Sequence, residues 1–175
     1  MSNPNCIKEL FIAGTGLVIL GLTTFLYSSK NFNVVNKNIK INNVIDGDTI
    51  TVLDKNSQEY NIRLACIDAP ELNQKEGIKA KEEIVNLLEE FDNPNITLNI
   101  IATDRYNRLI TEVYINELNL NQHLVSVGLA VIYPQYFNCT DKDSYLYHQK
   151  LAKDNELNLW SNPDFVMPWL WRRNN

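Results

Sequence analysis

Short runs of β-branched and apolar residues, separated by turn residues, fill most of the sequence between residues 39 and 115. Within residues 58–67, Ile62 and Leu64 alternate with Asn61 and Arg63, which is the period of a half-buried strand. The turn signals between the runs mark where each strand should end. Strands are therefore predicted over residues 39–45, 48–53, 58–67, 95–102 and 110–115.

Apolar residues recur with helical spacing in three further segments. The first is residues 78–91, and the second is residues 121–127, where Gly128 suits the end of a helix. The third is residues 141–156, where Asp141 suits the N-cap. Together with the strands, these segments predict an α+β domain: a small β-barrel with about three packed helices. The aromatic tail after this domain is expected to form a packed flap from Trp160, Phe165, Trp169 and Trp171.

The N-terminal region differs from the rest, because residues 10–27 form an 18-residue stretch without a charged side chain. As a helix this N-terminal hydrophobic segment would be about 27 Å long, close to the thickness of a bilayer's hydrocarbon core. The sequence after it, residues 25–30, lacks the small residues of a signal-peptide cleavage site. We expect an uncleaved membrane anchor, with a cleaved signal peptide or a buried helix as alternatives. The polar residues 31–38 suit a linker, so the predicted domains are residues 1–38 and 39–175.

The charge of the chain argues against simple electrostatic binding of nucleic acid. The net charge is −5, and residues 1–40 contribute four lysines against one glutamate. The remaining residues carry 12 basic and 20 acidic side chains, a net charge of −8. Proteins that bind nucleic acid usually present a basic surface. A nucleic-acid function for this chain therefore needs a locally basic site or a bound cation.

Cysteine and histidine are too few to build a site alone. The three cysteines, Cys6, Cys66 and Cys139, are far apart in the sequence, which excludes a disulfide scaffold and a four-cysteine zinc site. We expect Cys66 in the core and Cys139 as a loop thiol. His123 and His148 are expected to be packing or helix-surface residues, since a lone histidine is weak evidence of catalysis.

Three short segments near predicted strand ends concentrate the charged residues. They are Ile-Asp-Gly-Asp-Thr at residues 45–49, Arg-Leu-Ala-Cys-Ile-Asp-Ala-Pro-Glu at residues 63–71, and Asp-Arg-Tyr-Asn-Arg at residues 104–108. In this order and at this spacing they resemble the staphylococcal (micrococcal) nuclease family, also called thermonuclease-like domains. The similarity continues through residues 127–130, Tyr133, Tyr136 and residues 157–161, so that it covers residues 41–161.

The resemblance implies a five-stranded OB-like β-barrel and calcium-dependent cleavage of phosphodiester bonds in DNA and RNA. It implies that Asp48 and Asp68 bind Ca²⁺ through their carboxylates and Ala69 through its backbone carbonyl, with Asp46 behind them. Calcium prefers a mixed set of carboxylate and carbonyl oxygens. The family usually has threonine where this chain has Ala69, but a backbone carbonyl does not depend on the side chain.

The resemblance also assigns the reacting groups. Glu71 would act as general base or orient the attacking water, and Arg63 and Arg108 would clamp the phosphate through paired N–H groups. Substrate contacts are implied for Arg105, Tyr106, Tyr133 and Tyr136. For the three tyrosines, packing in the core or at its rim is the alternative.

Two function classes remain open at this stage. The first is an active nuclease, and the second is a catalytically inactive OB-like module that binds nucleic acid or protein. The presence together of all five charged residues, Asp48, Arg63, Asp68, Glu71 and Arg108, favours the active enzyme. We expect DNA and RNA as substrates, a membrane contact through residues 10–27, and a monomer. The family's exported members favour a domain outside the cytoplasm, either anchored or secreted.

Overall fold

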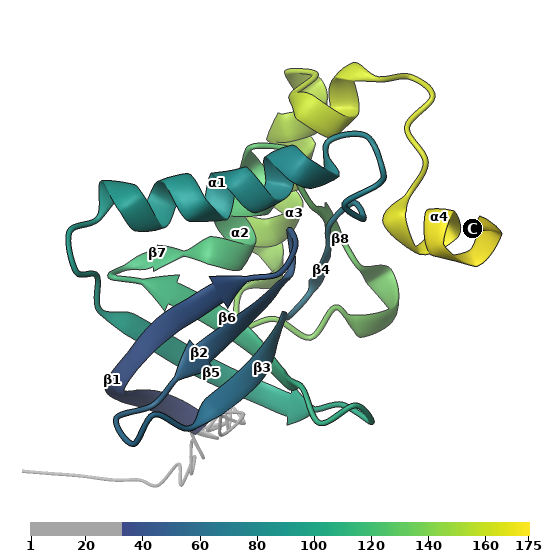
Figure 1. The fold of residues 1–175 in the computed structure, drawn as a ribbon. Helices are drawn as coiled ribbons and strands as arrows, with labels where there is room; N and C mark the ends of the chain where they lie inside the picture. Colours follow the sequence, from purple (N-terminus) through teal and green to yellow (C-terminus); the bar gives the residue numbers. More distant parts are fainter. Residues whose placement is uncertain (1–32) are drawn as a thin grey trace, which may run out of the picture. The chain divides into compact units, whose positions relative to one another are not determined.

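A closed barrel of five strands forms the body of the computed structural model, which describes residues 33–175 (Figure 1). Neighbouring strands pair antiparallel in the order β3-β2-β1-β5-β6, and a parallel pairing of β3 with β6 closes the barrel. These strands are β1 (Asn33–Val44), β2 (Thr49–Leu53), β3 (Glu59–Leu64), β5 (Ile96–Thr103) and β6 (Leu109–Ile115). The prediction of an OB-like α+β barrel is confirmed for this part of the chain.

Three very short strands extend this framework. β7 (Leu118–Asn119) pairs with the end of β6, while β4 (Ile67–Asp68) pairs antiparallel with β8 (Val131–Ile132). The β4–β8 pair matters for the site described below, because it brings residues 67–68, which follow β3, next to residues 131–132.

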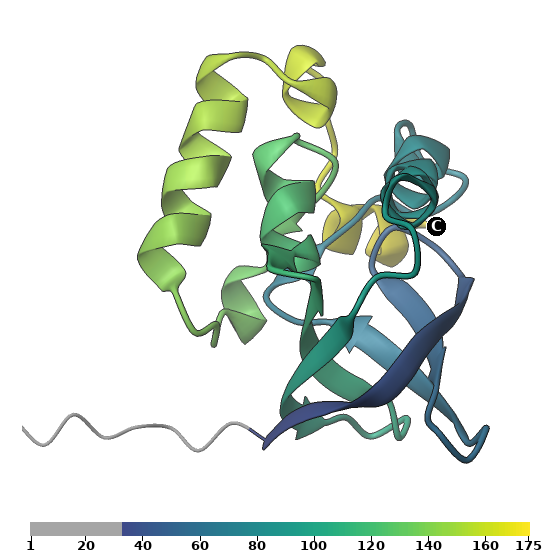
Figure 2. The ribbon, with the colours of Figure 1, turned by 90° about the vertical axis from the view of Figure 1, so that its left-hand side faces the viewer.

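The helices lie outside the barrel (Figures 1 and 2). α2 and α3 lie side by side, and α1 runs across the end of the barrel. Their bounds are α1 (Gly77–Glu90), α2 (Leu120–Ser126), α3 (Lys142–Asp154) and α4 (Pro168–Asn174). The first three match the predicted helices; α4 is a fourth helix inside the tail for which we predicted only a packed flap. Two single 3₁₀ turns, Pro134–Tyr136 and Asn158–Ser161, complete the described elements.

The predicted helix ends are confirmed by their local geometry. Gly128 follows α2 with a φ of 70°, the left-handed conformation that glycine adopts without steric cost. The Asp141 side chain accepts a hydrogen bond from the Ser144 backbone N–H, as an N-cap residue does.

The core fills the barrel and the space beneath the helices. Ile50, Ile62 and Val113 are fully buried on three barrel strands, and Ile84 and Leu124 are fully buried on α1 and α2. Burying a side chain of this size contributes about 1.5–3 kcal/mol relative to leaving it in water. The alternation seen in the sequence is therefore the inside–outside alternation of barrel strands.

The structure corrects two local expectations. β1 begins at Asn33 and pairs there with β5, so the first strand is longer than the predicted residues 39–45 and includes most of the predicted linker. β3 ends at Leu64 rather than continuing to residue 67, because Cys66 has a φ of 70° and turns the chain. The boundary between the two predicted domains stays a prediction.

Cys66 lies in the core as expected, but the expectation that Cys139 is a loop thiol is wrong, because the two cysteines form a disulfide. They are 73 residues apart in the sequence, but their Cα atoms lie 5.9 Å apart. The β4–β8 pairing explains this proximity, and the Tyr133 N–H also donates to the Cys66 carbonyl at 2.8 Å.

The predicted membrane segment, residues 10–27, lies outside the described residues. Within residues 33–175, no helix is both long and apolar enough to cross a bilayer.

Candidate active site

The turn between β1 and β2 carries the first pair of carboxylates. The Asp48 N–H donates to Oδ1 of Asp46 at 2.9 Å, which tightens the turn as expected for a supporting residue. A Cβ atom at Gly47 would lie 2.6 Å from the Cβ of Ala80 and 2.7 Å from the Cβ of Ala69. Only glycine therefore lets this turn pack against α1 and against the segment that follows Asp68.

Arg63 of β3 joins the two predicted metal-binding carboxylates. Its Nη2 lies 3.0 Å from Oδ2 of Asp48 and 2.8 Å from Oδ1 of Asp68. The Ala69 N–H donates to Oδ2 of Asp48 at 2.8 Å. The structure thus brings Asp48, Arg63, Asp68 and Ala69 together at one end of the barrel, and we call these four residues the acidic cluster.

Because the acidic cluster is buried, its ionised carboxylates need positive charge close by. Asp68 is fully buried, and this burial, together with the nearby Asp48 carboxylate, raises the pKa of Asp68 to about 6 although Arg63 and Arg172 oppose the shift. Burial and Asp48 also raise the pKa of Asp46. Since ionised carboxylates out of water are costly unless they are paired, a second cation beside Arg63 stabilises this cluster.

In the structure that second cation is a side chain that our sequence reasoning missed. Arg172 of α4 donates from Nη2 to both Asp68 oxygens, at 2.9 and 2.7 Å, and from Nη1 to Oε1 of Glu71 at 2.7 Å. Its signal in the sequence is weak: Arg172 and Arg173 follow the aromatic residues of the tail, and the charge deficit of the domain calls for cations near its carboxylates.

Glu71 sits at the open side of the acidic cluster, on the loop before α1. The Gln74 N–H donates to the Glu71 carbonyl at 2.8 Å. A Cβ at Gly77 would lie 1.9 Å from that same carbonyl oxygen. Any residue other than glycine at position 77 would therefore force the loop and the start of α1 apart. The side chain of Glu71 remains partly exposed, which leaves it accessible from solvent.

A second group of charged residues lies in the β5–β6 turn, residues 104–108, which we call the arginine loop. Asp104 accepts the backbone N–H groups of Tyr106 and Arg108, each at 2.9 Å, and Nε of Arg108 at 2.8 Å. These bonds lower the pKa of Asp104, although its slight burial alone would raise it. Asn107 has a φ of 62°, a left-handed turn conformation that asparagine adopts more readily than most residues.

The arginine loop is exposed, and its arginine side chains contact other residues of the same loop. The guanidinium carbons of Arg105 and Arg108 lie 4.9 and 5.6 Å from the centroid of the Tyr106 ring, and Tyr106 is 64% exposed. Among the described residues, Arg108 pairs with Asp104 and not with a carboxylate of the acidic cluster. Leu109 pairs with Ile62 across β3 and β6, so Arg108 directly precedes the strand beside the one that carries Arg63.

The two remaining predicted substrate residues lie near β8. The rings of Tyr133 and Tyr136 are 5.2 Å apart between centroids, and Tyr136 is exposed. Tyr133 also stacks on Trp169 of α4, with ring centroids 5.4 Å apart and an interplanar angle of 17°. The alternative of rim packing therefore fits Tyr133 in this structure, while Tyr136 stays open to solvent.

The donor set of the acidic cluster fits a metal ion with oxygen ligands. Asp68 already holds a cation through both of its oxygens, and Asp48 lies across Arg63 from it. Within residues 33–175, no group of three or more histidine, cysteine, aspartate or glutamate side chains is arranged to hold a metal ion. A site here would thus combine the two carboxylates with backbone or water oxygens.

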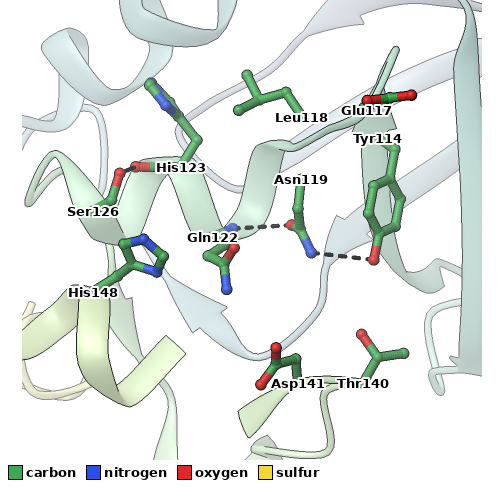
Figure 3. A pocket seen from close by; sticks show the side chains of 10 residues that line it. All are labelled: Tyr114, Glu117, Leu118, Asn119, Gln122, His123, Ser126, Thr140, Asp141 and His148. Carbon is green, nitrogen blue, oxygen red and sulfur yellow. Dashed lines mark hydrogen bonds between the residues drawn. The ribbon is translucent and has the colours of Figure 1, made fainter. Parts of the chain in front are cut away.

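A separate polar pocket of about 350 Å³ lies between α2 and the start of α3 (Figure 3). His123 and His148 line it from the two helices; Nε2 of His123 is 2.6 Å from Glu83, and Nδ1 of His148 is 2.9 Å from the Ser144 carbonyl. Neither lysine nor arginine lines the pocket, so it offers no guanidinium or ammonium group to a phosphate. We therefore take the acidic cluster, and not this pocket, as the candidate active site.

Comparisons with known proteins find one matching family and several relatives. The family described as staphylococcal nuclease homologue matches residues 61–162. An uncharacterized endonuclease of Haemophilus influenzae is 35% identical over 130 residues, which cover 74% of this chain and 70% of that protein. A micrococcal nuclease of Shigella flexneri is 36% identical over 139 residues, covering 74% of this chain and 77% of that protein. An uncharacterized endonuclease of Escherichia coli is 37% identical over 131 residues, covering 74% and 80%.

Proposed function

This chain belongs to the staphylococcal nuclease homologues and is a nuclease that acts on nucleic acids, and we propose that it hydrolyses phosphodiester bonds in both DNA and RNA with calcium. The family resemblance drawn from the three charged segments is thereby confirmed. The observation that carries the proposal is the buried pairing of Arg63 with Asp48 and Asp68.

Nucleases of this family need a metal ion, and we propose Ca²⁺. The Asp48 and Asp68 carboxylates and the Ala69 carbonyl would hold it, with Asp46 supporting the Asp48 turn. Two carboxylates completed by backbone and water oxygens suit the larger and more flexible coordination of calcium better than the strict octahedron of magnesium. When bound, the ion would polarise a phosphoryl oxygen and neutralise the charge of the cluster.

The protein side chains would then divide the remaining work. Glu71, partly exposed beside the acidic cluster, would accept the proton of the attacking water or orient it. Arg63 would fix the two carboxylates and present its charge to the phosphate, and Arg108 would contact the phosphate from the turn that precedes the neighbouring strand. Guanidinium groups suit this because their planar N–H pairs match phosphate oxygens.

Arg105, Tyr106, Tyr133 and Tyr136 are proposed to contact the nucleic acid around the cleaved bond. The exposed rings of Tyr106 and Tyr136 offer faces on which bases can stack regardless of sequence. Stacking on a base does not depend on whether the sugar is ribose or deoxyribose, so such contacts suit an enzyme that cleaves both DNA and RNA.

The test is cleavage of plasmid DNA, single-stranded DNA and RNA by the full-length chain, with calcium, with magnesium and with chelator. The full chain is preferable to a fragment starting at residue 38, because such a fragment would lose part of β1. We expect cleavage of all three substrates with calcium, and little with magnesium or chelator. Equal rates with both metals, or full activity in chelator, would contradict the calcium site.

We also propose that the domain is anchored by residues 10–27 and works outside the cytoplasm, with a secreted form as the alternative. The Cys66–Cys139 disulfide supports an oxidising compartment, where such bonds form and persist. Protease protection on intact cells, combined with alkylation of free thiols before mass spectrometry, tests this. We expect the domain to be accessible to external protease and both cysteines to resist alkylation until reduction. A protected domain with alkylated cysteines would reverse the proposed location.

A further inference from the structure

The C-terminal tail returns to the active site from the far end of the chain. Arg172, on α4, contacts Asp68 and Glu71, which precede it by 104 and 101 residues. Its guanidinium donates to both oxygens of Asp68, the proposed calcium ligand. It also donates to one oxygen of Glu71, which is proposed to deprotonate or orient the attacking water. Hydrogen bonds from a guanidinium to carboxylates are among the stronger hydrogen bonds in proteins.

Three further contacts hold the tail in this position. Trp169 stacks on Tyr133, one of the proposed substrate contacts. Nε1 of Trp171 donates to Oδ1 of Asn73 at 3.3 Å, and Nε2 of the buried Gln74 donates to the Val166 carbonyl at 2.5 Å. The tail is therefore docked at several points along its length and does not rest on a single ion pair.

We propose that residues 163–175 form an autoinhibitory strap, in which Arg172 occupies the carboxylates that the metal ion needs. The inference rests on the proposed calcium site. A guanidinium and Ca²⁺ cannot share both oxygens of Asp68, so calcium binding requires that Arg172 leave. Release of Arg172 also frees Glu71, and release of Trp169 uncovers Tyr133.

The charges explain why the strap docks when no metal is bound. Arg63 of the barrel pairs with Asp48 and Asp68, and Arg172 supplies a second positive charge to Asp68 and to Glu71. Because Arg172 remains 39% exposed while Asp68 is fully buried, a competing cation reaches the Asp68 carboxylate only as the guanidinium leaves it. The apparent affinity for calcium is then the intrinsic affinity multiplied by the fraction of molecules in which the strap is undocked.

The test measures calcium affinity of the full-length protein by titration calorimetry for the wild type, Arg172→Gln and Arg173→Gln. The Arg173→Gln control removes the same charge from the same helix, and among the described residues Arg173 has no ion pair with a carboxylate. We expect Arg172→Gln to bind calcium on the order of tenfold more tightly, and Arg173→Gln to match the wild type. Equal tightening in both variants would show a simple charge effect and would overturn the strap.

A second variant separates release of the strap from loss of a cation. Trp169→Ala leaves Arg172 in place but removes the stack on Tyr133, so it should tighten calcium binding in the same direction by a smaller factor. Calcium should also change the tryptophan fluorescence of the wild type, and Trp169→Phe should reduce that change. A fluorescence signal and calcium affinity that none of these variants alters would contradict the proposal.

DNA cleavage distinguishes failure of the strap from failure of the proposed function. If the wild type cleaves DNA with calcium while Arg172→Gln has the same calcium affinity and rate, the strap is wrong and the function stands. If Arg172→Gln instead cleaves more slowly with unchanged calcium affinity, Arg172 is a substrate contact and the strap is again wrong. If neither protein binds calcium or cleaves DNA, both proposals fall.

Discussion

The acidic cluster is proposed to bind a metal cation and the arginine loop to bind phosphate, and the two regions differ in their burial and in the chain segments that hold them. The acidic cluster is buried, and three chain segments hold it: the turn after β1, strand β3 and strand β4. The arginine loop is a single exposed turn that Asp104 organises through three hydrogen bonds. The barrel thus fixes the position of the proposed metal, while the loop can adjust to a substrate of variable sequence.

This contrast predicts that substitutions in the two regions have separable consequences. A change in the acidic cluster should alter stability and catalysis together, because the same contacts serve both. A change in the arginine loop should alter catalysis or substrate binding alone, because few of its contacts reach the core. Four substitutions test this difference, beginning with the largest expected effect.

Arg63→Lys should lower turnover on the order of 10³-fold and also destabilise the protein by about 2 kcal/mol. Lysine keeps the charge but cannot contact Asp48, Asp68 and the Leu64 carbonyl from one planar group. Single-turnover cleavage and urea unfolding would measure the two effects. A variant that loses turnover at unchanged stability would show that the cluster does not depend on this pairing.

Arg108→Lys should lower turnover on the order of 10²-fold while changing the free energy of unfolding by less than about 0.5 kcal/mol. The side chain is 33% exposed, and its ion pair with Asp104 is the kind that contributes little to stability. The same two assays apply, with Arg105→Lys as a neighbour in the same loop. Near-normal turnover of Arg108→Lys would remove Arg108 from the proposed clamp.

Gly47→Ala should destabilise the protein by about 1–3 kcal/mol and weaken calcium binding. The new Cβ would meet the Cβ atoms of Ala80 and Ala69, which are fixed to the backbone and cannot rotate away. Thermal unfolding and calorimetry measure the two effects. Adding Ala80→Gly should restore part of the calcium affinity, since it removes one of the two clashes; no coupling between the substitutions would refute this packing.

Local patterns made the barrel predictable from the sequence, while the acidic cluster was implied by the resemblance of the three charged segments to the staphylococcal nuclease family. Alternation identified the strands, and the Asp46-Gly47-Asp48 turn and the Arg63–Glu71 segment lie at strand ends that the barrel brings together. The Asn107 turn and the Asp141 cap were predictable for the same reason, because each depends on residues within a few positions.

The features that could not be predicted all depend on contacts between distant segments. Cys66 adopts a positive φ that a cysteine rarely takes, and its disulfide partner is 73 residues away. Helix α4 is only seven residues long and has no periodic signal, and the place of Arg172 follows from contacts more than 100 residues away. Such pairings follow from the closed barrel, which local patterns do not describe.

Tyr106→Leu is expected to have the smallest effect, a rise in KM of about fivefold with unchanged kcat and stability. Tyr106 is 64% exposed, so its removal leaves no cavity, but leucine offers no aromatic face to a base and none to the guanidinium groups of Arg105 and Arg108. Steady-state cleavage of a short single-stranded DNA measures both constants. Tyr106→Phe is the matched control, because it keeps the ring and should keep KM near the wild-type value. If both variants raise KM equally, the hydroxyl and not the ring contacts the substrate; if either lowers kcat, Tyr106 affects the chemical step and not substrate binding alone.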